Sequence, residues 1–213
     1  MKNWLEYDPE RAIGHLCEAD AQLAALIERV GQFAMRRSGP VDPFLALLRA
    51  IVYQQLSGRA AATIHARVEA LFDGVPDAAS ARTIDPETYR DAGLSAAKTR
   101  AVLDLAERRL DGTVPSRRVL KNLADAEVIE RLTQVRGVGP WTVQMLLIFN
   151  LGRPDVLPLA DLGIQKGYRL TYGMRKLPAA RTLTRAGRRW APYRSVASWY
   201  LWRAADLETA GEW

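Results

Sequence analysis

A short glycine-containing segment between two apolar stretches is the feature that most constrains how this chain folds. Residues 135–140 read VRGVGP, an amphipathic segment precedes them, and an apolar run covers residues 141–149. This pattern predicts a helix, a tight hairpin and a second helix. Gly137 and Gly139 permit positive φ and leave backbone N–H groups uncovered where the second helix begins, a position that favours a phosphate. The hairpin is therefore a candidate phosphate-binding site, although GVGP alone better fits an ordinary turn between two core helices.

The rest of the sequence is helical almost throughout. Apolar residues recur at helical spacing, and Gly, Pro, Ser and Asp residues mark the ends of the segments. Besides the two hairpin helices, we expect helices within residues 8–37, 44–56, 59–72, 86–92, 95–111, 162–172, 178–190 and 195–207. Residues 73–81 are expected to form a loop, and no strand pattern of convincing length is present. The sequence therefore predicts an all-α fold.

Composition limits the class of protein to which the hairpin can belong. A hydrophobic content of 48% over 213 residues is enough to bury an ordinary core. The single cysteine, Cys17, excludes an internal disulfide and a cysteine-held zinc or iron–sulfur centre. No apolar run approaches the roughly 20 residues of a membrane span, and residues 1–10 lack the apolar core of a signal peptide. We therefore expect a globular, cytoplasmic protein without membrane contact.

Positive charge is concentrated in one part of the chain. The formal net charge is +6, and residues 162–205 contain no acidic residue. The ten basic residues of this window are Lys166, Arg169, Arg175, Lys176, Arg181, Arg185, Arg188, Arg189, Arg194 and Arg203. Such a run is often only a solvated face, and an excess of arginine over lysine also fits a GC-rich genome. The length of the window nevertheless favours a surface for a polyanion, and we expect a nucleic acid.

A longer pattern around the hairpin carries a family resemblance. The motif LxxVxGVGxWTV at residues 132–143 is followed by a loop that contains glycine and proline and ends in a single aspartate. This combination resembles the helix-hairpin-helix DNA glycosylases, whose signature is the hairpin, a Gly/Pro-rich loop and a catalytic aspartate. The matching residues are Gly137, Val138, Gly139, Pro154, Pro158 and Asp161. GPWT at 139–142 and DLGIQK at 161–166 are most similar to the alkylpurine branch, 3-methyladenine DNA glycosylase II.

The resemblance implies a two-lobed helix-hairpin-helix glycosylase fold with a cleft between the lobes. We expect residues 1–213 to form this single all-α unit, in a short form without the N-terminal β domain of longer relatives. One lobe would span residues 44–155 and contain the hairpin, and residues 1–43 with 156–213 would form the second lobe and carry the basic surface. The expected working state is a monomer on double-stranded DNA that contains alkylated bases.

Asp161 is the candidate catalytic residue. An N-glycosidic bond breaks through an oxocarbenium-like sugar, so one carboxylate beneath the sugar can stabilise the charge and orient the attacking water. Asp161 also stands where the N-cap of the following helix would be, and both roles are compatible. The other carboxylate in the preceding loop is Asp155. In bifunctional relatives a lysine replaces Trp141 and attacks the sugar, so the resemblance implies a hydrolase without lyase activity.

Aromatic residues would hold the flipped base. The resemblance places Trp141 and Trp202 at pocket positions, with Tyr53 as a weaker candidate, although a tryptophan can equally belong to the core. Electron-rich rings attract a cationic purine. A cationic base such as 3-methyladenine or 7-methylguanine already has a weakened glycosidic bond, whereas a neutral base needs a proton donor. His15 and His65 lie far from the motif in sequence, so we expect cationic lesions to be preferred.

The remaining candidates would contact the DNA itself. Residues 54–57, QQLS, resemble the segment that fills the gap left by an extruded base, with Gln55 as the plug; the alternative is a polar helix C-terminus in solvent. Lys98 matches a basic position near the DNA-side helices of the family or is a plain surface charge. The DNA-binding candidates are Gln54, Gln55, Leu56, Gly137, Val138, Gly139 and Lys166.

The resemblance also implies a structural cation but no required cofactor. On family spacing, Na⁺ or K⁺ would be bound by the backbone carbonyls of Thr133, Val135 and Val138.

Two other functions remain open. A non-catalytic helix-hairpin-helix DNA-binding protein would need only the hairpin and the basic surface, and Asp161 would be incidental. A glycosylase for oxidised or mismatched bases would more typically carry the lysine or a metal cluster.

Overall fold

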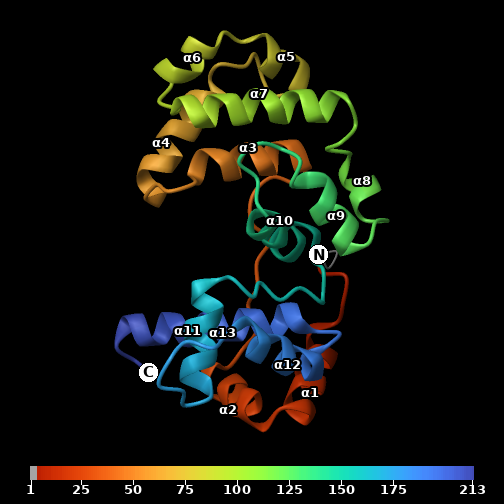
Figure 1. Cartoon of the computed structure of the whole chain (residues 1–213), viewed down its shortest axis with the longest axis vertical. Helices are drawn as coiled ribbons and strands as arrows, with labels where there is room; N and C mark the ends of the chain where they lie inside the picture. The colour runs from red at the N-terminus through yellow and green to blue at the C-terminus, as the bar shows by residue number, and fades with distance from the viewer. Residues whose placement is uncertain (1–3) are drawn as a thin grey trace. The chain divides into compact units, whose positions relative to one another are not determined.

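The regular secondary structure of this protein is helical. The computed structural model describes residues 4–213, and in this part of the chain every regular element is a helix (Figure 1). The prediction of an all-α fold is confirmed. None of the helices in residues 4–213 is long and apolar enough to cross a membrane. The chain divides into two compact units, one formed by Ser38–Leu146 and the other by the residues up to Arg37 together with Leu147–Trp213.

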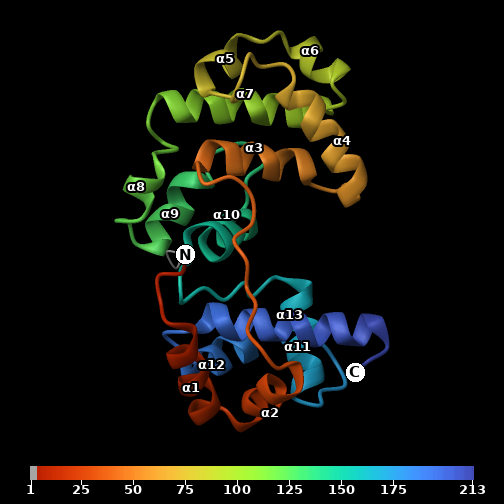
Figure 2. The same ribbon diagram turned by 180° about the vertical axis from the view of Figure 1, so that it is seen from behind.

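The Ser38–Leu146 unit is built around α3 and α7. Its helices are α3 (Pro43–Tyr53), α4 (Gly58–Glu69), α5 (Ala78–Thr83), α6 (Pro86–Asp91), α7 (Ala96–Leu110), α8 (Arg117–Leu120), α9 (Asp125–Leu132) and α10 (Pro140–Leu146). Figures 1 and 2 both show α7 between α3 on one side and α5 and α6 on the other. Leu47 and Ile51 of α3 and Val102 and Leu105 of α7 are fully buried, so these two helices supply the centre of the core.

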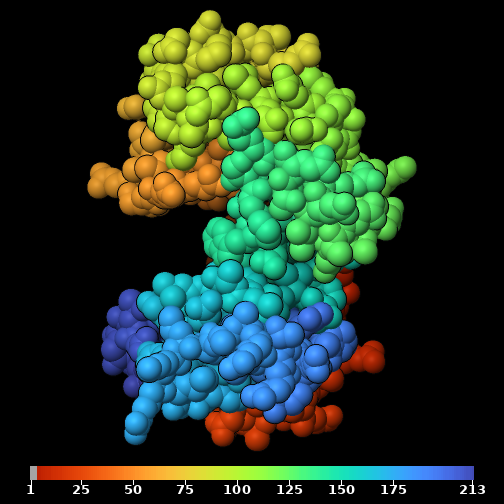
Figure 3. All heavy atoms as spheres, in the orientation of Figure 1, coloured from red at the N-terminus to blue at the C-terminus, as the bar shows by residue number. Residues whose placement is uncertain are grey.

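The other unit is built around the last helix. It comprises α1 (Pro9–Ala19), α2 (Ala21–Val30), the π-helix Leu147–Leu151, α11 (Leu162–Thr171), α12 (Ala180–Trp190) and α13 (Arg194–Ala210). α13 contacts α1, α2, α11 and α12, and its residues 195–201 are buried. Figure 3 shows the red N-terminal atoms against the blue atoms of the C-terminal third of the chain. Both ends of the chain therefore contribute to one core.

Glycine allows α11 and α13 to approach closely. A Cβ atom on Gly167 would lie 1.9 Å from the carbonyl oxygen of Leu201, far inside van der Waals contact. Any side chain at position 167 would therefore push the two helices apart. Because α11 begins directly after Asp161, this contact fixes where that aspartate lies relative to α13.

The boundaries of the two units differ from those expected. The lobe predicted as 44–155 begins at Ser38 and ends at Leu146. Residues 147–155 belong to the other unit because they bond to its two ends. Gly152 accepts a hydrogen bond from the backbone N–H of Glu6 (3.0 Å), and the carbonyl of Pro154 accepts one from Ser195 (2.9 Å).

Several helices also differ from their expected ranges. The first strong helix, expected over 44–56, ends at Tyr53 because a turn with a positive φ at Gln55 follows it. Part of the loop expected over 73–81 is helical, since Asp77 caps α5. The apolar run after the hairpin is helical, as expected, but changes from α-helix to π-helix at Leu147.

Candidate active site

Asp161 is held at the N-terminus of α11 by two N–H donors. Its Oδ1 atom accepts a hydrogen bond from the backbone N–H of Ile164 (2.9 Å) and another from the indole Nε1–H of Trp202 on α13 (2.9 Å). Asp161 is therefore the N-cap of α11, as predicted, and its carboxylate is half-buried. The two donors fix the carboxylate rotamer at the start of the helix.

A glycine gives Trp202 access to this carboxylate. A Cβ atom on Gly163 would lie 2.7 Å from Cδ1 of Trp202 and 3.1 Å from Oδ1 of Asp161. The ring of Trp202 also packs against Phe149, with centroids 5.4 Å apart and planes inclined by 32°. The structure therefore brings the predicted catalytic aspartate and one predicted pocket aromatic into direct contact, with a second aromatic ring beside them.

The loop before Asp161 is anchored to the start of α13. Arg194 binds Asp155 through two charge-assisted hydrogen bonds, Nε to Oδ1 at 2.6 Å and NH2 to Oδ2 at 2.7 Å. Ser195 Oγ accepts the N–H of Val156 (3.0 Å), and Ser198 Oγ donates to the carbonyl of the same residue (3.3 Å). Asp155, the other carboxylate of the loop before Asp161, thus positions this loop.

The predicted hairpin lies between α9 and α10. Gly137 has φ +75°, as a tight turn requires, but Gly139 does not adopt a positive φ. The space where a Cβ atom of Gly139 would lie is open. Val138 is buried, and its N–H donates to the carbonyl of Val135 at 3.0 Å. Gly139 therefore leaves the outer surface of the turn accessible at the start of α10.

The turn after α3 is bonded to this hairpin. The side-chain amide of Gln54 donates to the carbonyl of Gly137 (2.8 Å). Lys98 Nζ donates to the carbonyls of Val52 (2.7 Å) and Gln54 (2.8 Å), and burial lowers the pKa of this ammonium group. Lys98 therefore closes the C-terminus of α3, where the sequence suggested a DNA-side or surface charge. One network joins the predicted gap-filling segment to the predicted phosphate-binding turn.

Gln55 is presented to solvent by a strained backbone. Its φ of 56° is the only positive value of a non-glycine residue in residues 4–213. Left-handed backbone is unfavourable for a residue with a long side chain and persists only where the surroundings hold it. Gln55 is exposed, as is Leu56 beside it, whereas Gln54 is turned onto the hairpin. The structure therefore separates Gln54 from its two neighbours, which the sequence had grouped with it.

The other two predicted pocket aromatics belong to the Ser38–Leu146 unit. Trp141 lies in the first turn of α10 and is 49% exposed. Tyr53 is half-buried: the guanidinium of Arg49 lies 4.0 Å from its ring centroid, and His65 meets it edge-on at 5.8 Å. Trp141 is thus the more accessible of the two rings.

The basic run is partly neutralised by acidic residues. Its ion pairs are Arg169 with Glu208, Arg189 with Asp20, Arg194 with Asp155, and Arg203 with Asp206. The other six basic residues of the run are exposed: Lys166, Arg175, Lys176, Arg181, Arg185 and Arg188. Acidic side chains from outside residues 162–205 therefore pair with four of the ten basic residues, which the sequence of this window alone could not indicate.

The described residues contain no group of His, Cys, Asp and Glu side chains that could hold a metal ion. A cation at the hairpin would depend on backbone carbonyls. The carbonyl of Val135 already accepts the N–H of Val138 and retains a second lone pair, so it can still bind a cation.

Comparison with known proteins agrees with this geometry. The family model of HhH-GPD superfamily base excision DNA repair proteins matches residues 48–192, which include the hairpin, the anchored loop and Asp161. The chain belongs to the HhH-GPD superfamily. DNA-3-methyladenine glycosylase 1 of Schizosaccharomyces pombe is 37% identical over 196 residues, which are 91% of this chain and 86% of that protein.

Two solved structures indicate which branch of the HhH-GPD superfamily the chain resembles. The S. pombe 3-methyladenine DNA glycosylase in complex with abasic DNA has a TM-score of 0.80 and 37% identity, covering 91% of this chain and 95% of the other. A DNA-3-methyladenine glycosidase from Bacillus halodurans has a TM-score of 0.87 and 34% identity, covering 95% and 92%. The resemblance to the alkylpurine branch is confirmed.

Sequence reasoning missed the residues that position the HhH-GPD motif. Arg194, Ser195 and Ser198 hold the loop. Lys98 was a candidate from the sequence, but its role in holding the turn after α3 was not foreseen. Only a weak indication of the residues that hold the loop is present in the sequence, namely that two serines interrupt the otherwise apolar segment 195–201. That both serines are buried became clear only from the packing of α13.

Proposed function

We propose that this HhH-GPD protein is a monofunctional DNA glycosylase that flips alkylated purines out of duplex DNA and hydrolyses their N-glycosidic bond. The observation that carries the proposal is the Asp161 carboxylate, fixed at the start of α11 by the N–H groups of Ile164 and Trp202. The names of the relatives, 3-methyladenine DNA glycosylases, support the substrate class.

In the proposed reaction the bond between C1′ of the sugar and the base nitrogen breaks first. Its electron pair leaves with the base, and the sugar becomes an oxocarbenium ion that Asp161 stabilises by its negative charge. Water then attacks C1′ and loses a proton to the carboxylate or to solvent. Because both donors to Asp161 bind the same oxygen, they hold the carboxylate plane while the charge develops.

The leaving group determines which bases this site can release. A cationic alkylpurine becomes neutral when it takes the bond electrons, so it needs no general acid. Trp202, in contact with Asp161, offers an aromatic ring to such a cation, a contact of roughly 0.5–2 kcal/mol. We assign the same role to Trp141 and a lesser one to Tyr53. The preferred substrates are 3-methyladenine and 7-methylguanine.

A cleavage panel of duplexes, each with a single defined lesion, tests this proposal. We expect single-turnover release of 7-methylguanine to be accelerated much more than release of hypoxanthine, each relative to its uncatalysed rate. Equal or greater acceleration for hypoxanthine would show that the site donates a proton. The product should be an intact abasic strand, and borohydride should trap no covalent complex, since Trp141 stands where a lysine would be needed.

The hairpin and its neighbouring turn are proposed to bind the DNA backbone and the gap left by the base. The N–H of Gly139 would contact a phosphate, whereas the N–H of Val138, also a predicted contact, already donates to the carbonyl of Val135. Lys166 would add charge from α11, and Gln55 with Leu56 would fill the gap. Phosphate contacts predict affinity that is largely independent of sequence and falls steeply with salt. A Gly139→Ala variant should fold normally, because its methyl group has open space, yet bind DNA more weakly. Unchanged binding would exclude phosphate contact at this position.

We further propose that the carbonyls of Thr133, Val135 and Val138 hold Na⁺ or K⁺ when DNA is bound, with no other cofactor required. DNA affinity measured at constant ionic strength should then fall when the alkali cation is replaced by a bulky organic cation. That the enzyme is monomeric and cytoplasmic stays a prediction from the sequence.

A further inference from the structure

A cluster of basic side chains lies at the opposite end of α11 from Asp161. Asp161 caps the N-terminus of this helix, and Tyr172 follows its last residue. The ten residues of α11 separate the two ends by about 15 Å. Beside Tyr172 the surface contains a cavity of about 800 Å³, lined by Asp20, Tyr168, Tyr172 and three arginines of α12.

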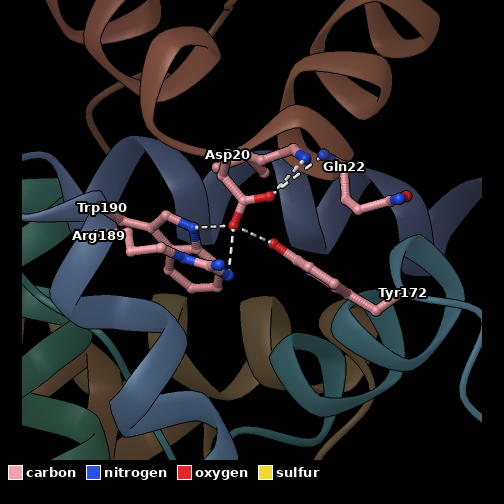
Figure 4. A network of polar contacts seen from close by, with 6 residues as sticks. Asp20, Gln22, Tyr172, Arg189 and Trp190 are labelled. Atoms are coloured by element: carbon pink, nitrogen blue, oxygen red, sulfur yellow. Dashed lines mark hydrogen bonds and ion pairs between the residues drawn. The ribbon is translucent and has the colours of Figure 1, made fainter.

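The buried carboxylate that lines this cavity, Asp20, already accepts hydrogen bonds at both of its oxygen atoms. Asp20 Oδ2 accepts hydrogen bonds from the hydroxyl of Tyr172 (2.6 Å), NH2 of Arg189 (2.9 Å) and Nε1 of Trp190 (3.0 Å), as Figure 4 shows. Its Oδ1 accepts the N–H groups of Gln22 and Leu23. Five donors therefore compensate this charge, and Asp20 uses only one of the three arginines.

The other two arginines carry uncompensated charge at the cavity. Arg185 and Arg188 are exposed, and neither forms an ion pair with any residue of the described chain. Against the single carboxylate, the three guanidinium groups leave the cavity with a net charge of +2. A guanidinium binds phosphate oxygens through two parallel hydrogen bonds. The chemistry of the cavity therefore suits a phosphate group.

The row of arginines extends beyond the cavity along α12. Arg181 precedes Arg185 by four residues and Arg188 follows it by three, so all three lie on one face of the helix. From Arg181 to Arg188 the row covers about 10 Å. A single small anion would occupy only the cavity, whereas a row of this length matches successive phosphates of a polymer.

We propose that this face of α12 is a second DNA-binding site, which takes the sugar-phosphate backbone of a DNA segment other than the one bound for repair. Arg185 and Arg188 bind its phosphates at the cavity, and Arg181 binds the adjoining backbone. The Asp20 network holds the C-terminal turn of α12 in place beneath them. The site does not depend on the reaction proposed at Asp161, and its ligand is undamaged duplex.

Energy transfer between two labelled duplexes tests the proposal. A short duplex with an abasic-site analogue carries the donor dye and is first mixed with an equal amount of the protein. An undamaged duplex that carries the acceptor dye is then added. Transfer requires both duplexes on one protein. The double variant Arg185→Gln/Arg188→Gln should bind the second duplex at least about tenfold more weakly, the loss expected for charge-assisted hydrogen bonds. The salt slope of this second binding should fall by about 2.

Matched variants separate the site from general charge. Arg67→Gln/Arg82→Gln removes two exposed, unpaired arginines of the Ser38–Leu146 unit and should leave energy transfer unchanged. Arg185→Lys/Arg188→Lys keeps the charge and should retain most of the transfer. Thermal stability of all three should match the parent, because none of these arginines forms an ion pair in the described chain.

Base release from a single short duplex by the Arg185→Gln/Arg188→Gln variant should equal that of the parent. Absence of energy transfer with the parent, or equal transfer with this variant, would overturn the proposal. A parallel loss of base release would assign the arginines to the first duplex, and abolition of transfer by inorganic phosphate at constant ionic strength would assign them to a small anion. A protein without glycosylase activity would fail only the base-release assay, so the two proposals are tested separately.

Discussion

Asp20 and Asp161 use the same local motif in two different surroundings. Each is the N-cap of a helix, and each accepts the indole N–H of a tryptophan distant in sequence, Trp190 for Asp20 and Trp202 for Asp161. Asp20 is only 5% exposed and also binds a tyrosine and an arginine, whereas Asp161 is half-buried. A carboxylate surrounded by donors stabilises the fold, and one left accessible can act on a substrate.

The largest difference between the two should appear in catalysis. An Asp161→Asn variant retains the oxygen that accepts the N–H groups of Ile164 and Trp202 but loses the charge. We expect single-turnover release of 7-methylguanine to fall at least roughly a hundredfold, with little change in thermal midpoint. Asp20→Asn is the control and should keep the parental rate. Near-parental release by Asp161→Asn would make Asp161 a helix cap only, like Asp20.

Asp20, in contrast to Asp161, should matter for stability rather than for catalysis. Asp20→Ala removes the cap of α2 and leaves the hydroxyl of Tyr172 and the N–H of Trp190 without their acceptor. We expect the free energy of unfolding, measured by chemical denaturation, to fall by about 2–4 kcal/mol. Base release at a temperature where the variant is folded should be close to parental. A loss below about 1 kcal/mol would mean that the network contributes no more than an average surface contact.

The two tryptophans allow a more conservative comparison. Trp202→Phe keeps an aromatic ring beside Phe149 but removes the N–H donated to Asp161. We expect base release to slow by roughly tenfold, the effect of one hydrogen bond to a charged group. Trp190→Phe removes the equivalent donor to Asp20 and should lower stability without slowing release. The same rate loss in both variants would argue against a specific role of Trp202.

The smallest effect concerns pH. Burial raises the pKa of Asp20, but hydrogen bonds from Tyr172, Trp190 and the backbone of Leu23, together with the charge of Arg189, outweigh it and hold the pKa below its usual value. The stability this provides is fully present above the unfolded-state pKa of about 3.9 and is lost as pH falls through the lowered folded-state pKa. The stability difference between the parent and Asp20→Asn, from denaturation curves, should therefore shrink on acidification below about pH 4. A difference that grows in acid would contradict this assignment.

Local features of the sequence were sufficient to predict much of the fold and part of the candidate site. The hairpin followed from helical periodicity on both sides of GVGP, and the N-cap role of Asp161 followed from its place before an apolar turn. These features depend on residues within a few positions of one another. The structure and the family comparisons agree with them for that reason.

Features that depend on distant residues could not be predicted. Asp20 meets Tyr172 and Arg189 across more than 150 residues of sequence, and no spacing rule indicates such a contact. The carbonyl of Gln54, which follows α3, accepts a hydrogen bond from Lys98, 44 residues further along the chain. The same holds for Gly167, whose need for glycine arises only from its contact with α13.

The division of the chain has a consequence for the order of folding during synthesis. The Ser38–Leu146 unit is contiguous, so it can complete its core as soon as its last residues leave the ribosome. The unit that carries Asp161 needs α1 and α2, which are made before the Ser38–Leu146 unit, and α13, which is made after it. The hairpin is therefore expected to fold before Asp161 is positioned, and a chain interrupted before α13 would contain the hairpin but lack the Trp202 N–H that holds the Asp161 carboxylate.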